Sequence, residues 1–143
     1  MENKLFLVSQ KAFIFKDGRL LIIKNSKGRH GGISQWELPG GILEANEEIN
    51  DGLAREIREE TSLDIEIKNI LVVWKKMTTV SELGGKEVPL LGIGYKCSWV
   101  SGEVILGDEH EEYLWVSKDQ LKDFSFSHNS EVGVVAYLKS FHL

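Results

Sequence analysis

Apolar residues near the start of the chain occur in two short runs, over residues 11–16 and 19–24. The runs are joined by Asp17-Gly18, a pair that readily supplies the positive φ angles of a two-residue hairpin turn. The pattern therefore predicts a β-hairpin in this part of the chain.

Stretches rich in Ile, Val and aromatic residues return in the second half of the chain and predict further strands. On one of these strands, Gly92 and Gly94 leave room for a ligand or mark a bulge. The predicted strands cover residues 64–76, 88–100 and 112–116, and a flexible hairpin loop over 81–87 joins the first two.

Three segments have the patterns of helices. Between Glu47 and Thr61, Leu53 and Ile57 fall four residues apart on one face, and no proline interrupts the segment. Residues 117–120 form a capping box, which begins a short helix that ends at about Lys122. A closing helix is predicted over residues 130–141, with an apolar side formed by Val132, Val135, Ala136 and Leu138.

The order of these elements is typical of an α/β fold with one mixed β-sheet covered on both faces, an α/β/α sandwich. The chain has 143 residues, of which 42% are hydrophobic, and this size suits one domain over residues 1–143. The net charge of −5 argues against extended nucleic-acid binding, which relies on basic stripes. A small anionic substrate is still compatible with this charge, because a bound metal can reverse the local sign.

Cys97 is the only cysteine, so no internal disulfide is expected, and its apolar neighbours predict a buried side chain. His110 and His128 each lack a second histidine or cysteine at ligand spacing and are interpreted as surface histidines. No apolar run approaches the roughly 20 residues that span a bilayer, and the first residues lack the layout of a signal peptide. We expect a cytoplasmic protein, monomeric or homodimeric, with no membrane partner.

Glu56, Glu59 and Glu60 occupy one narrow arc of the central helix, because positions i, i+3 and i+4 are neighbours on a helix surface. Like charges at this spacing repel by about 0.2 to 0.5 kcal/mol per pair, and by more in a partly dry cleft. A hard divalent cation, above all Mg²⁺, would relieve the repulsion. The alternative is a solvated charged face balanced by Arg55 and Arg58.

The residues around this helix resemble the Nudix box of the Nudix hydrolases, which reads Gly, five residues, Glu, seven residues, Arg-Glu-aliphatic-x-Glu-Glu-x-Gly-aliphatic. Residues 36–41 are similar to the family's lead-in, and residues 108–116 to its late acidic strand. Ser62 departs from the pattern at the helix exit, where a left-handed residue is expected and serine costs about 1 kcal/mol relative to glycine. The matching positions are Gly41, Glu47, Arg55, Glu56, Ile57, Glu59, Glu60 and Leu63.

The resemblance implies a Nudix-like fold and cleavage of a phosphoanhydride bond in a nucleoside diphosphate linked to another group. It implies Mg²⁺ as the cofactor, with Mn²⁺ as a substitute. The implied catalytic residues are Glu56, which is also proposed as the base, Glu59, and the supporting pair of Arg55 and Glu47. The implied metal ligands are Gly41 through its carbonyl, Glu56, Glu59, Glu60 and, outside the box, Glu109.

Other residues are candidates for substrate contact. Lys24 and Arg29 belong to a basic, glycine-rich stretch that contacts phosphate or is only a mobile surface loop. Phe126 and Asn129 resemble the base-reading segment of triphosphate-cleaving family members, although helix capping is the alternative for Asn129. Glu109 is spaced from the late strand like the family's auxiliary glutamate, or belongs to a solvated acidic loop.

The expected substrate is a small nucleotide, first of all a (deoxy)nucleoside triphosphate, oxidised forms included. ADP-ribose or a nucleotide sugar is the alternative. A non-catalytic nucleotide-binding domain is the rival class, and it is disfavoured because such a domain can lose its carboxylates without unfolding, whereas this chain keeps all three.

Overall fold

The computed structural model describes residues 5–26 and 33–140. The strands in these residues are β1 (Leu7–Lys16), β2 (Arg19–Asn25), β3 (Trp36–Glu37), β4 (Gly40–Ile42), β5 (Asp64–Val80), β6 (Lys86–Ser101) and β7 (His110–Val116). The helices are α1 (Ile49–Thr61), α2 (His128–Lys139) and two short 3₁₀ helices, η2 (Ser81–Leu83) and η3 (Lys118–Asp123).

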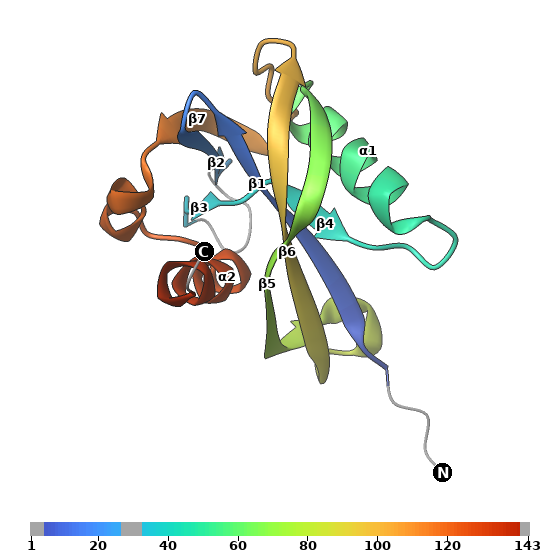
Figure 1. The fold of residues 1–143 in the computed structure, drawn as a ribbon. Coiled ribbons are helices and arrows are strands. Elements are labelled where there is room, and N and C mark those ends of the chain that lie inside the picture. The colour runs from blue at the N-terminus through green and yellow to red at the C-terminus, as the bar shows by residue number, and fades with distance from the viewer. Residues whose placement is uncertain (1–4, 27–32, 141–143) are drawn as a thin grey trace.

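All of these strands belong to one sheet, in the order β3-β2-β1-β6-β5, with β4 paired to β1 and β7 paired to β2. The sheet is mixed because β1 and β6 run parallel, whereas the other pairs are antiparallel. Figure 1 shows α1 and α2 on opposite sides of the sheet.

Successive side chains along β1 point to opposite faces and so divide the core into two layers. Ala12 and Ile14 pack on one face in a cluster with Leu53 of α1. Phe13 packs on the other face, with its ring centroid 4.8 Å from that of Tyr137 of α2. The predicted α/β/α sandwich is confirmed.

The first predicted hairpin is confirmed, since Lys16 pairs with Arg19 across a turn in which Asp17 and Gly18 have φ angles of 51° and 77°. The second hairpin is longer than predicted. β5 continues to Val80 and β6 begins at Lys86, so the connection is tighter than the expected loop over 81–87. The polar side chains near the ends of β5 and β6 do not end these strands, because their backbone groups still pair across the two strands. Gly84 and Gly85, both with positive φ angles, close the turn.

Gly92 and Gly94 make room for aromatic rings of the protein itself. A Cβ on Gly92 would lie 1.9 Å from the Trp74 ring, and one on Gly94 would lie 2.6 Å from the Phe13 ring. Gly94 also pairs with Val72 beside a register shift, as the bulge alternative expects. The space beside these glycines is therefore used for packing.

The predicted apolar side of the closing helix is wrong. Helix α2 buries Ser130, Gly133, Val134 and Tyr137, whereas Val135 and Leu138 are 41% and 37% exposed, and Val132 and Ala136 are only partly buried. Shape complementarity between α2 and the sheet sets the buried face. Gly133 lets the helix approach Trp74, and Tyr137 supplies a large ring that packs against the sheet. A small or polar residue on that face carries no hydrophobic signal in the sequence.

The remaining local predictions are confirmed with small shifts in bounds. Ser62 ends α1 in the left-handed region with φ 64°, and its hydroxyl donates to the Ile105 carbonyl at 3.0 Å. The capping box at Ser117 and Gln120 is present, although the helix that it begins is 3₁₀. Cys97 is buried. None of the described helices is long and apolar enough to cross a membrane.

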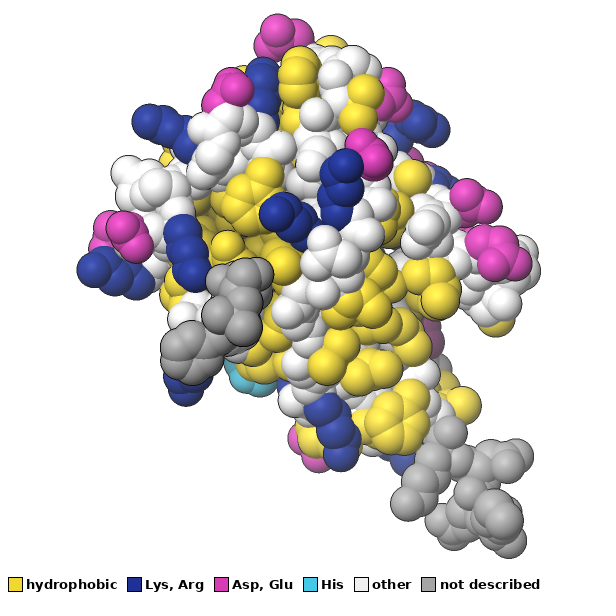
Figure 2. Space-filling view, viewed as in Figure 1, with side chains coloured by type: hydrophobic (Ala, Val, Ile, Leu, Met, Phe, Trp, Pro, Cys, Tyr) yellow, Lys and Arg dark blue, Asp and Glu magenta, His cyan; other side chains and the backbone are white. Residues whose placement is uncertain are grey.

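Apolar side chains also reach the surface over β5 and β6, on the face shown in Figure 2. Val73 and Met77 expose 57% and 47% of their surface on β5, which ends the strand order. The expectation of a monomer or homodimer stays a prediction.

Candidate active site

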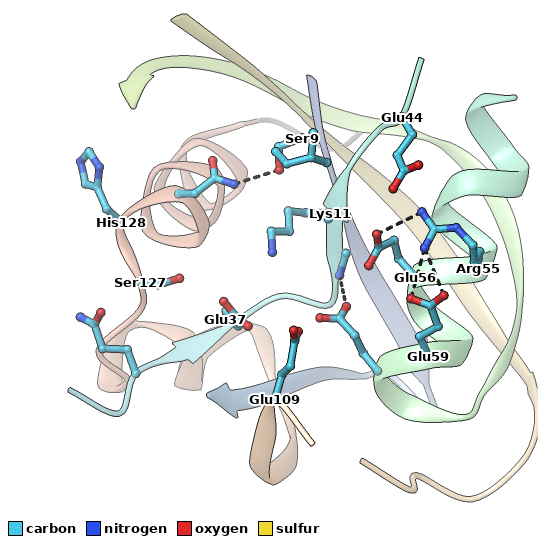
Figure 3. A pocket seen from close by; sticks show the side chains of 16 residues that line it. Ser9, Lys11, Glu37, Glu44, Arg55, Glu56, Glu59, Glu109, Ser127 and His128 are labelled. Carbon is cyan, nitrogen blue, oxygen red and sulfur yellow. Dashed lines mark hydrogen bonds and ion pairs between the residues drawn. The ribbon is translucent and has the colours of Figure 1, made fainter. Parts of the chain in front are cut away.

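A cleft of about 690 Å³ lies between α1 and the first turn of α2 (Figure 3). Its volume falls in the range of roughly 300–1,000 Å³ that is usual for ligand pockets. β1, β4, α1, the segment before β7 and the start of α2 contribute to its described lining. All five candidate metal ligands line this one cleft: Gly41, Glu56, Glu59, Glu60 and Glu109.

Arg55 gathers the carboxylates of the α1 arc. Its Nε and Nη2 donate to the two carboxylate oxygens of Glu47 at 2.6 and 3.0 Å, which is the expected pair. Its Nη1 donates to Glu59 at 3.1 Å, and its Nη2 also donates to Glu56 Oε1 at 3.2 Å. One guanidinium thus fixes three acidic side chains. Its planar set of N–H donors makes this possible, whereas the compact ammonium of a lysine could not.

The double glycine brings β4 against the acidic face of α1. A Cβ on Gly41 would lie 2.6 Å from the Glu56 carboxyl carbon, so only glycine leaves room for that carboxylate. Gly40 has φ 142°, and its N–H donates to Glu60 Oε1 at 2.7 Å. The backbone turn and two of the three carboxylates are therefore built as one unit. The alternative of a solvated charged face does not describe Glu60, which is buried.

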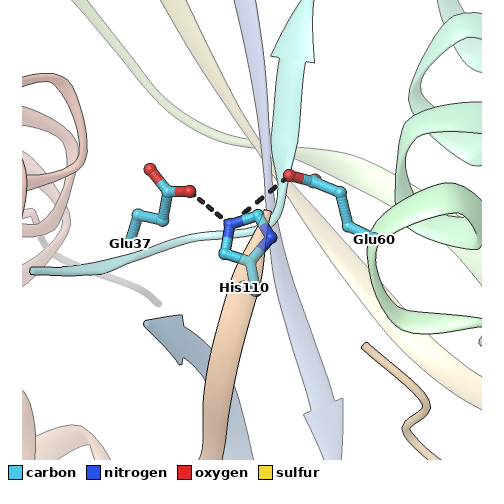
Figure 4. Close-up of side chains that lie close together, drawn as sticks. All are labelled: Glu37, Glu60 and His110. Atoms are coloured by element: carbon cyan, nitrogen blue, oxygen red, sulfur yellow. Dashed lines mark hydrogen bonds and ion pairs between the residues drawn. The ribbon is translucent and has the colours of Figure 1, made fainter. Parts of the chain in front are cut away.

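His110 is a buried residue of this site, and its interpretation as a surface histidine is wrong (Figure 4). Its Nε2 is hydrogen-bonded to Glu37 and lies 3.7 Å from Glu60 Oε2. One ligand atom from each of these residues lies within 4.8 Å of the others. Ligand spacing in a sequence detects only near neighbours, whereas these residues meet through β3, α1 and β7. His128, by contrast, is exposed as expected.

Lys11 lines the cleft, although the sequence did not indicate it. It lies on β1, is 7% exposed, and donates from Nζ to the Leu38 carbonyl at 3.1 Å. In the sequence it stands at the edge of an apolar run, where a strand-flanking surface lysine is the ordinary interpretation.

Comparison with known proteins now decides the family, because the profile of the NUDIX domain matches residues 6–134. The chain belongs to the Nudix hydrolase family. It is 29% identical over 108 residues to a MutT-like protein of Streptomyces ambofaciens, covering 76% of this chain and 61% of that protein. It is 28% identical over 119 residues to the nucleoside triphosphatase NudI of Escherichia fergusonii, covering 80% of this chain and 84% of NudI.

Solved Nudix structures have the same fold. The MutT protein from Methanosarcina mazei Go1 has a TM-score of 0.72 at 24% identity, covering 94% of this chain and 93% of that one. The MutT NUDIX hydrolase from Burkholderia pseudomallei has a TM-score of 0.72 at 27% identity, covering 93% of this chain and 98% of that one.

Burial raises the pKa of two of the three α1 carboxylates, Glu56 and Glu60. It raises the pKa of Glu60 to about 7, although the charge of Lys11 and the hydrogen bond from the Gly40 N–H oppose the shift. Burial also raises the pKa of Glu56, against the charge of Arg55. The hydrogen bond from Arg55 lowers the pKa of Glu47. A cation in the cleft would favour the charged forms of Glu56 and Glu60.

We expect the protein to lose stability as pH rises from 5 to 8 in the absence of divalent metal. Between the unfolded pKa of 4.5 and the folded pKa of about 7, the folded state holds more protons on Glu60 than the unfolded state does. The free energy of unfolding therefore falls as pH rises through this window, by up to about 3 kcal/mol. Urea denaturation in EDTA at both pH values measures the effect. Glu60→Gln should flatten the dependence, and an equally steep fall in that variant would contradict the assignment.

The substrate-contact candidates are placed in different surroundings. Asn129 lines the cleft, where its Nδ2 donates to Ser9 Oγ at 2.9 Å and its Oδ1 accepts from Trp74 Nε1 at 3.0 Å. These bonds replace the helix-capping alternative. Phe126 is 6% exposed and packs in the core. Lys24 forms an ion pair of 3.7 Å with Glu112, outside the described lining of the cleft, and Arg29 lies outside the described residues.

Proposed function

We propose that this Nudix hydrolase is a Mg²⁺-dependent pyrophosphohydrolase of small nucleotides, first of all a (deoxy)nucleoside triphosphate, oxidised forms included. The observation that carries the proposal is the convergence of five candidate oxygen ligands, from α1, β4 and the segment before β7, on one cleft. The similarity to NudI, named a nucleoside triphosphatase, supports the substrate class. The similar structures of a UDP-X diphosphatase and an ADP-ribose pyrophosphatase are only 19% and 18% identical and support the fold alone.

The residues of the cleft fit a divalent cation. The donor set is dominated by carboxylates, which suit hard ions such as Mg²⁺ and also Mn²⁺. The carboxylates already surround a cationic group in the form of Arg55, and Gly41 leaves its backbone open beside Glu56. Gly41, Glu56, Glu59, Glu60 and Glu109 would hold the ion. When bound, it screens phosphate charge and lowers the pKa of a coordinated water.

The protein's own groups have distinct proposed roles. Glu56 is half-buried between Gly41 and Arg55, and we assign it the role of general base that accepts a proton from the attacking water. Arg55 and Glu47 hold the helix carboxylates in register. Glu60 is a buried residue of the cleft lining and is proposed as a metal ligand.

We propose that the base of the nucleotide binds at the α2 side of the cleft. The bonds from Asn129 to Ser9 and Trp74 fix its amide, leaving one N–H of Nδ2 to donate to an acceptor on the base. Phe126 has too little exposed face to stack on a base and instead supports this segment from the core. Lys24 and Arg29 remain proposed phosphate contacts.

A panel of nucleotides with Mg²⁺ tests the proposal. A (deoxy)nucleoside triphosphate should yield the monophosphate and pyrophosphate, and this pair of products identifies the cleaved bond. Cleavage of ADP-ribose or a nucleotide sugar without cleavage of any triphosphate would replace the substrate class by the alternative. Binding of nucleotides without cleavage of any of them would favour the non-catalytic domain.

Glu109→Gln should slow hydrolysis about tenfold or more and raise the Mg²⁺ concentration for half-maximal rate, because it removes a carboxylate from the proposed ligand set. Steady-state rates over a Mg²⁺ titration measure both effects. Glu111→Gln is the matched control, since Glu111 is also exposed but accepts from Ser34 Oγ at 3.1 Å outside the described lining of the cleft. Equal, negligible effects of the two changes would leave Glu109 in a solvated acidic loop.

A further inference from the structure

Lys11 is a buried cation with hydrogen-bonding capacity to spare. Its ammonium carries three N–H donors. Among the described residues, the Leu38 carbonyl accepts one hydrogen bond from it, and no carboxylate lies within ion-pair distance of Nζ. Lys11 exposes only 7% of its surface, and a buried charge is costly unless other groups or a ligand pair with it. The remaining donors of Lys11 therefore call for an anionic partner.

The position of Lys11 indicates where that partner would lie. Figure 3 shows its ammonium between Glu56 on the α1 side and Ser127 at the start of α2, above Glu37. The only other lysine or arginine in the described lining is Arg55, and its guanidinium is already engaged by three carboxylates. The first turn of α2 adds partial positive charge, since its backbone N–H groups have no side-chain cap.

We propose that Lys11 is a substrate-binding residue that donates to a non-bridging oxygen of the bound diphosphate, between the α1 glutamates and the α2 side of the cleft. This inference rests on the proposed function. A polyphosphate presents more anionic oxygens than a metal site on one wall can cover, and those that face the centre of the cleft need donors. Lys11 supplies such donors at that point, held in place by Leu38.

A purely electrostatic role for Lys11 makes different predictions. The charge of Lys11 favours the ionised forms of Glu60 and Glu56. If it were only a counter-charge for these acids, its removal would strengthen Mg²⁺ binding, because a competing cation is lost, and would leave the affinity for the nucleotide unchanged. A phosphate contact instead raises KM for the nucleotide at saturating Mg²⁺.

The test compares Lys11→Met with Lys16→Met. Lys16 lies on the same strand, with its Nζ 4.2 Å from the centroid of the Trp99 ring and outside the described lining of the cleft. At saturating Mg²⁺, Lys11→Met should raise KM at least about tenfold, and Lys16→Met should change it less than twofold. Lys11→Arg, which keeps the charge, should restore part of the loss. If Lys11→Met does not fold, Lys11→Gln takes its place. An unchanged KM in the neutral variant would overturn the inference.

Calorimetry with pyrophosphate and Mg²⁺ separates this inference from the proposed function, because it needs no turnover. Weaker binding by Lys11→Met than by the wild type supports the phosphate contact, even if the wild type cleaves no nucleotide and the proposed function fails. Equal binding by both proteins, or binding by neither, overturns the contact while leaving the substrate panel to decide the function.

Discussion

Glu59→Gln should lower kcat about a hundredfold or more at saturating nucleotide and leave the melting midpoint nearly unchanged. The change keeps the shape of the side chain but removes one charge from the proposed metal-binding arc, where each carboxylate contributes to cation affinity and orientation. Stability should change little, since the Glu59 side chain is 59% exposed and its ion pair with Arg55 is accessible to solvent. Steady-state kinetics and thermal denaturation measure the two effects.

Glu66→Gln is a closely matched control for this experiment. The Glu66 side chain is 60% exposed and pairs with Lys68 at 3.0 Å, much as Glu59 pairs with Arg55 at 3.1 Å, but it lies on β5 outside the described lining of the cleft. It should retain full activity. Undiminished turnover in Glu59→Gln, or an equal loss in both variants, would remove Glu59 from the metal-binding arc.

Gly41→Ala should lower kcat about a hundredfold, because the added methyl group displaces the Glu56 carboxylate. The new Cβ would lie 2.6 Å from the Glu56 carboxyl carbon, well inside contact distance. A shift of about 1 Å in a catalytic group is enough for a loss of this size. Gly41 is not among the left-handed glycines, so alanine can adopt its backbone conformation and the fold should persist.

The Glu56→Ala background isolates this effect. In Glu56→Ala the carboxylate that the new methyl group would displace is absent. Adding Gly41→Ala to this variant should therefore cause no further loss of activity and little change in melting midpoint. Additive losses in the double variant would show that Gly41→Ala acts through the backbone of β4 instead of through Glu56.

The elements that local sequence determines were predicted well. The Asp17-Gly18 hairpin and the left-handed exit at Ser62 depend on backbone preferences of one or two residues. The arc of Glu56, Glu59 and Glu60 depends only on helical periodicity. These interactions are short in sequence, so their geometry follows from spacing alone, and the family pattern rests on the same spacing.

The sequence by itself therefore determined the fold class, the acidic helix and its pairing of Arg55 with Glu47. Only the tertiary structure placed Lys11 and Glu37 in the same cleft as Glu60, brought His110 beside Glu37 and Glu60, and chose the buried face of α2. The physical reason is the same in each case. Burial of a polar or small residue is decided by partners that strand pairing and helix packing bring from distant parts of the chain, and no spacing along one segment encodes that proximity.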